Sequence, residues 1–268
     1  MVRVGIQGLG LMGASLALAL RAARPDCEVV GRDPDPATMA KALRREMVAE
    51  GDVRDADLVV LAAPIPALPE LLAGLTGHAG VVTDLASTKV RVMAWAAAAQ
   101  VDLVGGHPMC GREQSGIDAA DPHLFRGAPW VLTRHEPPLT ELVRAVGARP
   151  VFMDAERHDR LVAGVSHAAF LLSAAYVLAM ARSPEWGAMQ EVAGTGFRDV
   201  SRLAAGDPAL YGAVVSTNRE AILDALREVE GSLARLRRHV EAADPRLVEL
   251  LEEARRARDR WAGDAGKG

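Results

Sequence analysis

Residues 2–13 read VRVGIQGLGLMG, an apolar run of strand length that leads directly into glycines at positions 8, 10 and 13. The next ten residues, 14–23, have the composition of a helix. Between a strand and a helix, G-x-G-x-x-G is typical of a dinucleotide-binding turn. The three glycines permit a tight turn, close approach of a pyrophosphate and close helix packing, and the helix start favours phosphate charge. We therefore predict nucleotide contacts at Gly8, Gly10, Leu11, Met12 and Gly13; the alternative is a tight turn that binds no nucleotide.

A second strand pattern, Glu28 to Gly31, ends at Arg32 and Asp33. Asp33 lies 20 residues after Gly13, where an acidic side chain accepts hydrogen bonds from the adenosine ribose hydroxyls. An acidic residue there would repel a 2′-phosphate, so NAD is favoured over NADP. Arg32 leaves the choice open, since its side chain could stack on adenine or tolerate that phosphate.

Further apolar runs alternate with helix-length segments through the first 154 residues. This alternation predicts an α/β fold with a mostly parallel, doubly wound sheet, in which ligands bind beyond the carboxyl ends of the strands. Ala63 and Pro64, Ser87, and His107 each come just past a predicted strand. One crevice could therefore collect all of them, although Ser87 could also cap a helix.

Strand patterns stop after Asp154, and helical runs follow over about 157–182, 185–205, 208–242 and 246–261. We predict a dinucleotide-binding domain over 1–154, a helical substrate and dimerisation domain over 155–262, and a disordered tail over 263–268. An apolar period in the last long helix suits packing on a partner subunit or on its own domain.

The chain has 268 residues, and 31 Lys plus Arg against 35 Asp plus Glu give a net charge of −4. This balance does not favour nucleic acid or an anionic membrane as a partner. Two cysteines are too few for a disulfide framework, and the N-terminus lacks a signal-peptide layout. We expect a cytoplasmic protein with no membrane span, on the reasoning that charged residues or proline interrupt each apolar run, and with no metal site.

Residues 105–116 read GGHPMCGREQSG and follow an apolar, strand-like run, 101–104. Glycines and a proline around His107 place it on a turn. Histidine titrates near neutrality, so His107 beside a dinucleotide site is suited to take the proton that accompanies hydride loss. The alternative is an ordinary loop histidine.

Polar residues also stand out among the helices. Ser166 and His167 open an apolar run, so His167 is either a core histidine or a site residue. Arg198 and Arg202 are four residues apart and would share a helix face, which suits carboxylate recognition. The alternative is a solvated face paired with Asp199 or Glu191.

These motifs resemble the prephenate and arogenate dehydrogenase family of tyrosine biosynthesis. The resemblance runs from the N-terminus to about residue 240. It rests on the glycine turn, Ser87-Thr88-Lys89, the His107 loop, His158-Asp159, Ser166-His167, and the segment from Gly196 through Asp207-Pro208, Tyr211 and Asn218.

The resemblance implies an NAD-dependent oxidative decarboxylation of prephenate to 4-hydroxyphenylpyruvate by a homodimer. It implies that His107 is the base for the ring hydroxyl, that Ser87 holds the imidazole or the hydroxyl, and that Arg202 binds a substrate carboxylate. Glu113 matches a family acid near the site entrance, and Tyr211 replaces a tryptophan of an aromatic wall. His167, Arg198 and Tyr211 complete the expected contacts of an anionic substrate.

One departure leaves the substrate open. Phe170 stands where the family motif has a second histidine. This protein could therefore prefer arogenate, or an analogue with an aminated ring. A 3-hydroxyacid dehydrogenase shares the glycine start but is expected to use a helix lysine, and the helices after 154 contain none. A non-catalytic NAD-sensing dimer is the alternative of another class.

Overall fold

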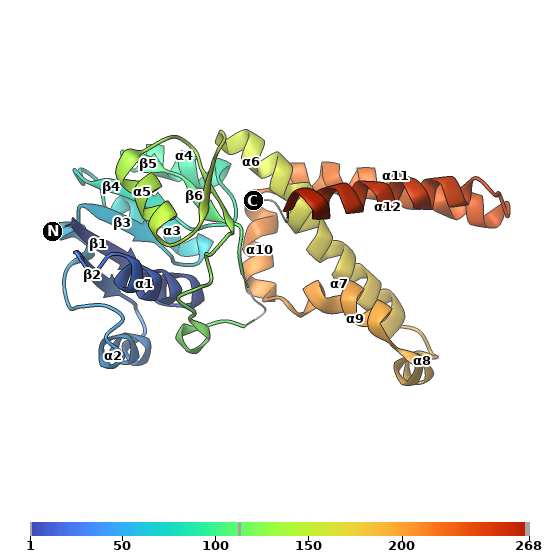
Figure 1. Ribbon diagram of the computed structural model, residues 1–268, viewed down its shortest axis with the longest axis horizontal. Helices are drawn as coiled ribbons and strands as arrows, with labels where there is room; N and C mark the ends of the chain where they lie inside the picture. Colours follow the sequence, from blue (N-terminus) through green and yellow to red (C-terminus); the bar gives the residue numbers. More distant parts are fainter. Residues whose placement is uncertain (1, 112–113, 266–268) are drawn as a thin grey trace. The chain divides into compact units, whose positions relative to one another are not determined.

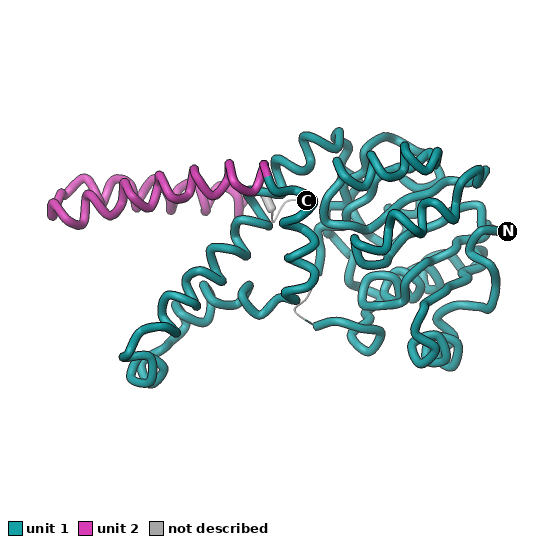
Figure 2. The backbone as a smooth tube through the Cα atoms, turned by 180° about the vertical axis from the view of Figure 1, so that it is seen from behind, with its two compact units in different colours: residues 1–219 teal, residues 220–268 magenta. Residues whose placement is uncertain are grey.

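The computed structural model describes residues 2–111 and 114–265 (Figure 1). These residues fall into two compact units, 1–219 and 220–268, coloured separately in Figure 2. The first unit contains both sheets and all of the predicted site residues that the structure describes.

A five-stranded parallel sheet forms the centre of the first unit. Its strand order is β2-β1-β3-β4-β5. Its strands are β1 (Val2–Gln7), β2 (Cys27–Arg32), β3 (Leu58–Leu61), β4 (Val81–Asp84) and β5 (Leu103–Val104). The order reverses direction between β1 and β3, and such a switch point is where doubly wound sheets bind ligands.

The helices of this region connect successive strands. They are α1 (Leu11–Ala23), α2 (Pro36–Arg44), α3 (Leu68–Ala73), α4 (Val90–Ala98) and α5 (Pro137–Ala145). Parallel crossovers are right-handed, so the reversal at β1 places α1 on one face of the sheet and α3 and α4 on the other. Contacts between α3 and α4 agree with this layering, and α5 packs against α1. The doubly wound α/β prediction is confirmed.

A second sheet carries His107, and here two sequence predictions are wrong. The strands β6 (Gly106–Pro108), β7 (Pro129–Leu132) and β8 (Arg149–Phe152) form a separate three-stranded sheet, with β6 antiparallel to β7. His107 therefore lies in a short strand paired with Val131, not on a turn. The runs around residues 130 and 150, expected to extend the main sheet, build this second sheet instead.

After β8 every described element is helical. Helix α6 (Ala155–Val162), a π-helical turn (Ala163–His167) and α7 (Ala168–Ala181) are continuous. They are followed by α8 (Trp186–Val192), α9 (Thr195–Ser201), a 3₁₀ turn (Arg202–Ala205) and α10 (Pro208–Thr217). The predicted run over 185–205 is interrupted at Ala193 and Gly194, and the run over 208–242 is interrupted at Asn218.

The second unit is formed mainly by α11 (Arg219–Glu241) and α12 (Leu247–Ala265), which lie side by side in both views (Figures 1 and 2). Because α12 continues through Ala265, the predicted disordered tail is wrong for 263–265, and 266–268 lie outside the described residues. The compact units divide at 219/220, whereas strands give way to helices near Asp154. The domain boundary at 154/155 stays a prediction.

The continuous helix Ala155–Ala181 is long and apolar enough, by length and composition alone, to cross a membrane. The expectation that every apolar run is interrupted is wrong, since residues 161–181 contain no Asp, Glu, Lys, Arg or Pro. About a third of the apolar window is buried within the chain. A helix that packs in the core of a soluble assembly meets the same criterion.

Candidate active site

The glycine turn after β1 has the geometry that a pyrophosphate requires. Gly8 has φ +98°, a conformation that favours glycine. A Cβ on Gly13 would lie 1.9 Å from the carbonyl oxygen of Gly8, so only glycine fits there. Gly10 faces open space on its Cβ side and precedes α1 without a side-chain cap. Free amides at the start of a 13-residue helix, beside open space, fit a phosphate group.

Asp33 lies at the end of β2, close to this turn. Its Oδ2 accepts a hydrogen bond from Leu9 N at 2.7 Å, and its Oδ1 accepts one from Asp35 N at 2.9 Å. The carboxylate is therefore fixed beside the glycine turn. Arg32 is exposed, and Ala63 and Pro64 follow β3 on the other side of the switch point.

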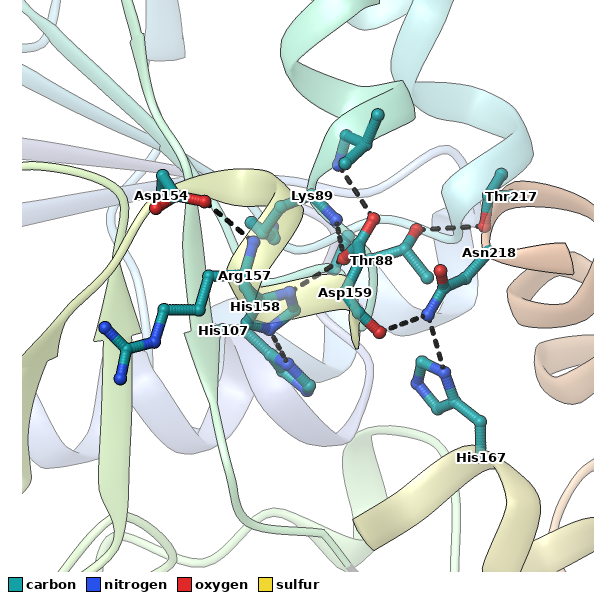
Figure 3. Close-up of polar contacts among 12 residues, drawn as sticks. Thr88, Lys89, His107, Asp154, Arg157, His158, Asp159, His167, Thr217 and Asn218 are labelled. Atoms are coloured by element: carbon teal, nitrogen blue, oxygen red, sulfur yellow. Dashed lines mark hydrogen bonds and ion pairs between the residues drawn. The ribbon is translucent and has the colours of Figure 1, made fainter. Parts of the chain in front are cut away.

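His107 is buried near the carboxyl ends of β4 and β5. The residue is 8% exposed, and its Nδ1 lies 2.8 Å from His158 Nε2 (Figure 3). His158 belongs to α6, and its own Nδ1 lies 2.8 Å from Asp159 Oδ1. Burial, with the nearby His158, Lys89 and His167, holds the pKa of His107 well below its usual range. The imidazole is therefore neutral at physiological pH.

A buried ion pair holds the backbone next to His107. Lys89 Nζ contacts Asp84 Oδ2, and both side chains are fully buried. Lys89 Nζ also donates to the Gly106 carbonyl oxygen at 2.6 Å, and Asp84 Oδ1 accepts from Gly106 N at 3.1 Å. Both polar groups of Gly106 are thus bound by the two ends of one ion pair.

The start of α4 is tied to the later helices. Asp159 Oδ1 accepts from Lys89 N at 2.7 Å, and Oδ2 accepts from Val90 N at 2.9 Å (Figure 3). The Thr88 hydroxyl lies 2.9 Å from that of Thr217 at the end of α10. The site is therefore held together by hydrogen bonds between the start of α4 and the helices α6 and α10, which are far apart in the sequence.

His167 presents an unused hydrogen-bonding group. Asn218 Nδ2 donates to the Asp159 carbonyl oxygen at 2.8 Å and lies 3.2 Å from His167 Nδ1. His167 Nδ1 is then an acceptor, and Nε2 carries the proton. Nε2 is buried without a partner among the described residues. Burial lowers the pKa of His167 to about 4, so the ring is a neutral N–H donor.

Two family models match the chain: the nucleotide-binding domain of prephenate dehydrogenase over residues 16–149, and its dimerization domain over 154–253. The chain belongs to the prephenate dehydrogenase family. Its N-terminal part is the NAD-binding Rossmann domain of that family, an oxidoreductase family of tyrosine biosynthesis. The expected family and fold class are confirmed.

Individual members of the family agree in sequence and in structure. A prephenate dehydrogenase of Lactococcus lactis is 30% identical over 272 residues, which is 96% of this chain and 77% of that protein. A prephenate dehydrogenase of A. aeolicus, solved with hydroxyphenyl propionate and NAD+, superposes with a TM-score of 0.90 at 28% identity, covering 97% and 98% of the two chains. An arogenate dehydrogenase of Synechocystis gives 0.83 at 31% identity, covering 97% and 100%.

Phe170 stands where the resemblance leads one to expect a second histidine. Its ring is buried and stacks on Tyr211, with centroids 3.3 Å apart and planes at 7°. Gly206 lies against the edges of both rings, since a Cβ there would be 2.9 Å from Tyr211 and 3.1 Å from Phe170. Tyr211 and Phe170 therefore form one stacked aromatic pair, and an aromatic wall against the substrate stays a prediction.

The two predicted arginines differ in setting. Arg198 is highly exposed on α9, with Nε 4.0 Å from Asp199 Oδ1, which matches the alternative of a solvated, paired face. Arg202 begins the 3₁₀ turn that packs against α7, the helix of Phe170. Its placement leaves carboxylate binding by Arg202 as a prediction.

The predicted roles of Ser87 and Glu113 are the last to be compared with the structure, which describes Ser87 only. Ser87 is partly exposed between β4 and α4, and it does not cap α4, which begins at Val90. The Nδ1 of His107 is hydrogen-bonded to His158, so Ser87 is not its partner at this nitrogen. A role for Ser87 toward the substrate hydroxyl stays a prediction. Glu113 lies outside the described residues.

His158, Asp159 and Asn218 belong to the sequence motifs, but no role was predicted for them. One signal was available: Asp154 caps α6 by accepting from Arg157 N, which places His158 and Asp159 early on a helix where both are buried. Adjacent buried polar residues in a helix require partners. The identity of those partners was not available from spacing, because they lie 51 to 70 residues away along the chain.

Proposed function

We propose that this member of the prephenate dehydrogenase family oxidises prephenate with NAD, releasing carbon dioxide and 4-hydroxyphenylpyruvate. The observation that carries this is His107, a buried and neutral imidazole at the carboxyl edge of the nucleotide-binding sheet. A general base must be unprotonated and must lie beside the reacting group, and His107 meets the first condition at neutral pH.

The proposed chemistry balances without net proton release. NAD, when bound, accepts the hydride that leaves the hydroxyl-bearing ring carbon. His107 takes the hydroxyl proton as that carbon–oxygen bond gains double-bond character. The bond from the ring to the carboxylate on the opposite carbon then breaks, and its electrons make the ring aromatic as carbon dioxide leaves. The phenolate oxygen takes a proton back, so His107 returns to its neutral state.

The substrate anion needs donors, because the net charge of the protein does not attract it. Arg202 is proposed to bind a carboxylate as a charge-assisted pair. His167 would donate its unused Nε2–H to an oxygen of the side chain, and Tyr211 would pack on the ring. Ser87 would contact the ring hydroxyl, and Glu113 would orient or gate the entrance. Arg198 is given no role in substrate binding.

NAD is proposed over NADP because Asp33 is fixed beside the glycine turn, where its charge would repel a 2′-phosphate. The amides at the start of α1 would hold the pyrophosphate. No residue of the site is proposed to hold a metal. Among the described residues, no cluster of His, Cys, Asp or Glu has the arrangement of a metal site.

Arogenate, or a prephenate analogue with an aminated ring, is the second candidate substrate. Phe170 favours arogenate of these two, because its ring cannot donate a hydrogen bond to the keto acid side chain that prephenate and the analogue with an aminated ring share. The structural similarity to an arogenate dehydrogenase of Synechocystis supports the same alternative.

The protein is proposed to act as a cytoplasmic homodimer through its dimerization domain. Apolar side chains of the helical region remain exposed in the single chain: Leu161, Val165, Leu172, Tyr176 and Leu178. Exposed apolar surface of this kind marks interaction sites. A second copy of the chain would cover the exposed apolar side chains of this helix, so a membrane would not be needed to shield them from water. Light scattering after size exclusion would give twice the monomer mass.

The deciding experiment follows NADH formation at 340 nm with purified protein, NAD, and prephenate or arogenate in parallel. Turnover of prephenate with NAD supports the proposal, and preference for arogenate supports the second candidate. An NADP arm checks the cofactor. Silence with both substrates, despite NAD binding by calorimetry, would contradict prephenate and arogenate as substrates and favour the aminated analogue or a non-catalytic sensor.

A further inference from the structure

Three buried side chains form a continuous hydrogen-bonded line from His107 into α6. His107 Nδ1 lies 2.8 Å from His158 Nε2, and His158 Nδ1 lies 2.8 Å from Asp159 Oδ1 (Figure 3). The three residues are 8%, 0% and 3% exposed. Water therefore has little access to these bonds, and each proton along the line has a defined donor and acceptor.

Asp159 fixes the direction of this line. Its carboxylate accepts from Lys89 N at 2.7 Å and from Val90 N at 2.9 Å, at the start of the nine-residue helix α4. Two backbone donors and the positive end of a helix favour the ionised carboxylate. An ionised carboxylate only accepts hydrogen bonds, so His158 Nδ1 must carry a proton and donate it.

The remaining protons follow from that assignment. Neutral His158 with a proton on Nδ1 has a bare Nε2, which accepts from His107. His107 Nδ1 must then carry the proton of the bond between the two rings. Neutral His107 is left with a bare Nε2, the nitrogen on the far side of the ring from His158. This is the form that a general base needs before it meets a hydroxyl.

We propose that His158 and Asp159 are positioning residues for His107: they keep its Nε2 unprotonated, and they take up positive charge when Nε2 accepts a proton. The inference rests on the proposed role of His107 as the base. When Nε2 gains a proton, the Nδ1 proton can shift to His158 Nε2. His107 is then neutral again, and the charge lies on His158 next to the carboxylate of Asp159.

The surroundings explain why such charge uptake is needed. Among the described residues, the charged and titratable groups that act on the pKa of His107 are His158, Lys89 and His167. Lys89 is cationic and already paired with Asp84, and His167 is buried and neutral. Among these neighbours and their partners, only the line through His158 leads to an ionised carboxylate not already engaged by an ammonium group. Burial opposes a positive charge on His107 itself. Asp159 is the group that can stabilise this charge once it has moved to His158.

Nitrogen NMR of the histidine rings tests the tautomers independently of catalysis. Protein labelled with ¹⁵N at histidine should show His107 protonated at Nδ1 and bare at Nε2 at neutral pH, with assignment by loss of the signal in His107→Asn. In Asp159→Asn the amide can donate to His158 Nδ1, which would reverse both rings and place the His107 proton on Nε2. A wild-type His107 with its proton on Nε2 would overturn the proposal.

Kinetics of His158→Gln test the charge uptake. The Gln carbonyl can accept from His107 Nδ1, but it cannot carry the charge. We expect kcat to fall about 10- to 100-fold, the effect of losing a hydrogen bond to a charged group, with KM little changed. The acidic limb of the kcat/KM profile should move to lower pH, since protonated His107 is less stabilised.

His123→Gln is the matched control. It makes the same change from histidine to glutamine, but at an exposed position elsewhere in the chain. It should retain wild-type kinetics. A His158→Gln enzyme with wild-type kcat and an unshifted pH profile would overturn the charge uptake. If the wild-type protein turns over none of the substrates, the proposed function fails, and the NMR measurement still decides the tautomers.

Discussion

The ring of Phe170 lies face to face with the ring of Tyr211, with centroids 3.3 Å apart and planes at 7°. The pair joins α7 to α10. The resemblance leads one to expect a hydrogen-bonding histidine where Phe170 stands, so we predict that this apolar pair decides the selection among substrates that differ in their side chain.

Substitution of Phe170 by His should shift selectivity toward a keto acid. An imidazole N–H can donate to the keto acid side chain, so the kcat/KM ratio of prephenate over arogenate should rise about tenfold or more. Steady-state assays with both substrates measure the ratio. Phe170→Leu keeps the position apolar and should leave the ratio near wild type. An unchanged ratio in Phe170→His would show that the side chain of the substrate binds elsewhere.

Replacement of the proposed base should abolish most turnover. His107→Asn is expected to lower kcat by about 10²–10⁴-fold, the usual contribution of a general base. NAD affinity, measured by calorimetry, should change little because the glycine turn and Asp33 are untouched. Normal turnover in this variant would reject the assignment.

Arg202 and Arg198 offer a matched comparison on adjacent turns of the chain. Arg202→Ala should raise the KM for the substrate about 10- to 100-fold, through loss of a charge-assisted hydrogen bond, with NAD binding unchanged. Arg198→Ala should have little effect, because Arg198 is exposed beside Asp199. The opposite pattern, with Arg198 affecting KM and Arg202 silent, would exchange their roles.

Removal of the charge of Asp33 should relax the choice of cofactor. Asp33→Asn retains an acceptor beside the Leu9 amide but no longer repels a 2′-phosphate. The repulsion between two charges at close range is about 1–4 kcal/mol. Its loss should therefore raise the NADP/NAD ratio of kcat/KM at least about fivefold. Arg32→Ala in the same background separates the two possible roles of Arg32. A fall in NADP use alone would assign Arg32 to the phosphate.

Mild acid should destabilise the fold through the buried histidines. The pKa of His167 is lowered to about 4 and that of His107 is also depressed, so below pH 6.5 the unfolded chain binds protons that the folded chain does not. Each group should lower the free energy of unfolding by about 1.4 kcal/mol per pH unit between its unfolded and folded pKa values.

Urea unfolding at pH 7 and pH 5 measures this loss. His167→Gln removes one of the two titrating groups and should reduce the difference between the two pH values. The exposed His123→Gln should not reduce it. Equal midpoints at both pH values in the wild type would contradict the burial of neutral imidazoles.

The pattern of residues 2–33 was sufficient to predict the fold of the nucleotide-binding part of the chain. The strand, the three glycines, the helix and Asp33 follow one another at the spacings that a dinucleotide-binding turn requires. The same reasoning placed His107 on a turn. A three-residue strand flanked by glycine and proline has too short a period to be recognised, and its partner strand, β7, lies more than 20 residues away.

The polar line behind His107 could not be predicted for a related reason. His158, Asp159 and Lys89 meet only because α6 packs against α4, and this contact depends on tertiary structure that no local pattern encodes. The apolar helix shows a further limit of local patterns. The composition of residues 161–181 suits a membrane span as well as a protein interface, and the matched dimerization domain is what favours the interface.

The clamp on Gly106 has a consequence for how the site responds to a ligand. Both polar groups of this peptide are bound by Asp84 and Lys89 within the chain itself, and a Cβ at Gly106 would lie 2.5 Å from the Asp84 carbonyl oxygen. The backbone that carries the imidazole is therefore in its final place before any ligand arrives. None of the free energy of substrate binding has to go into reorganising it, and that free energy remains for orienting the substrate.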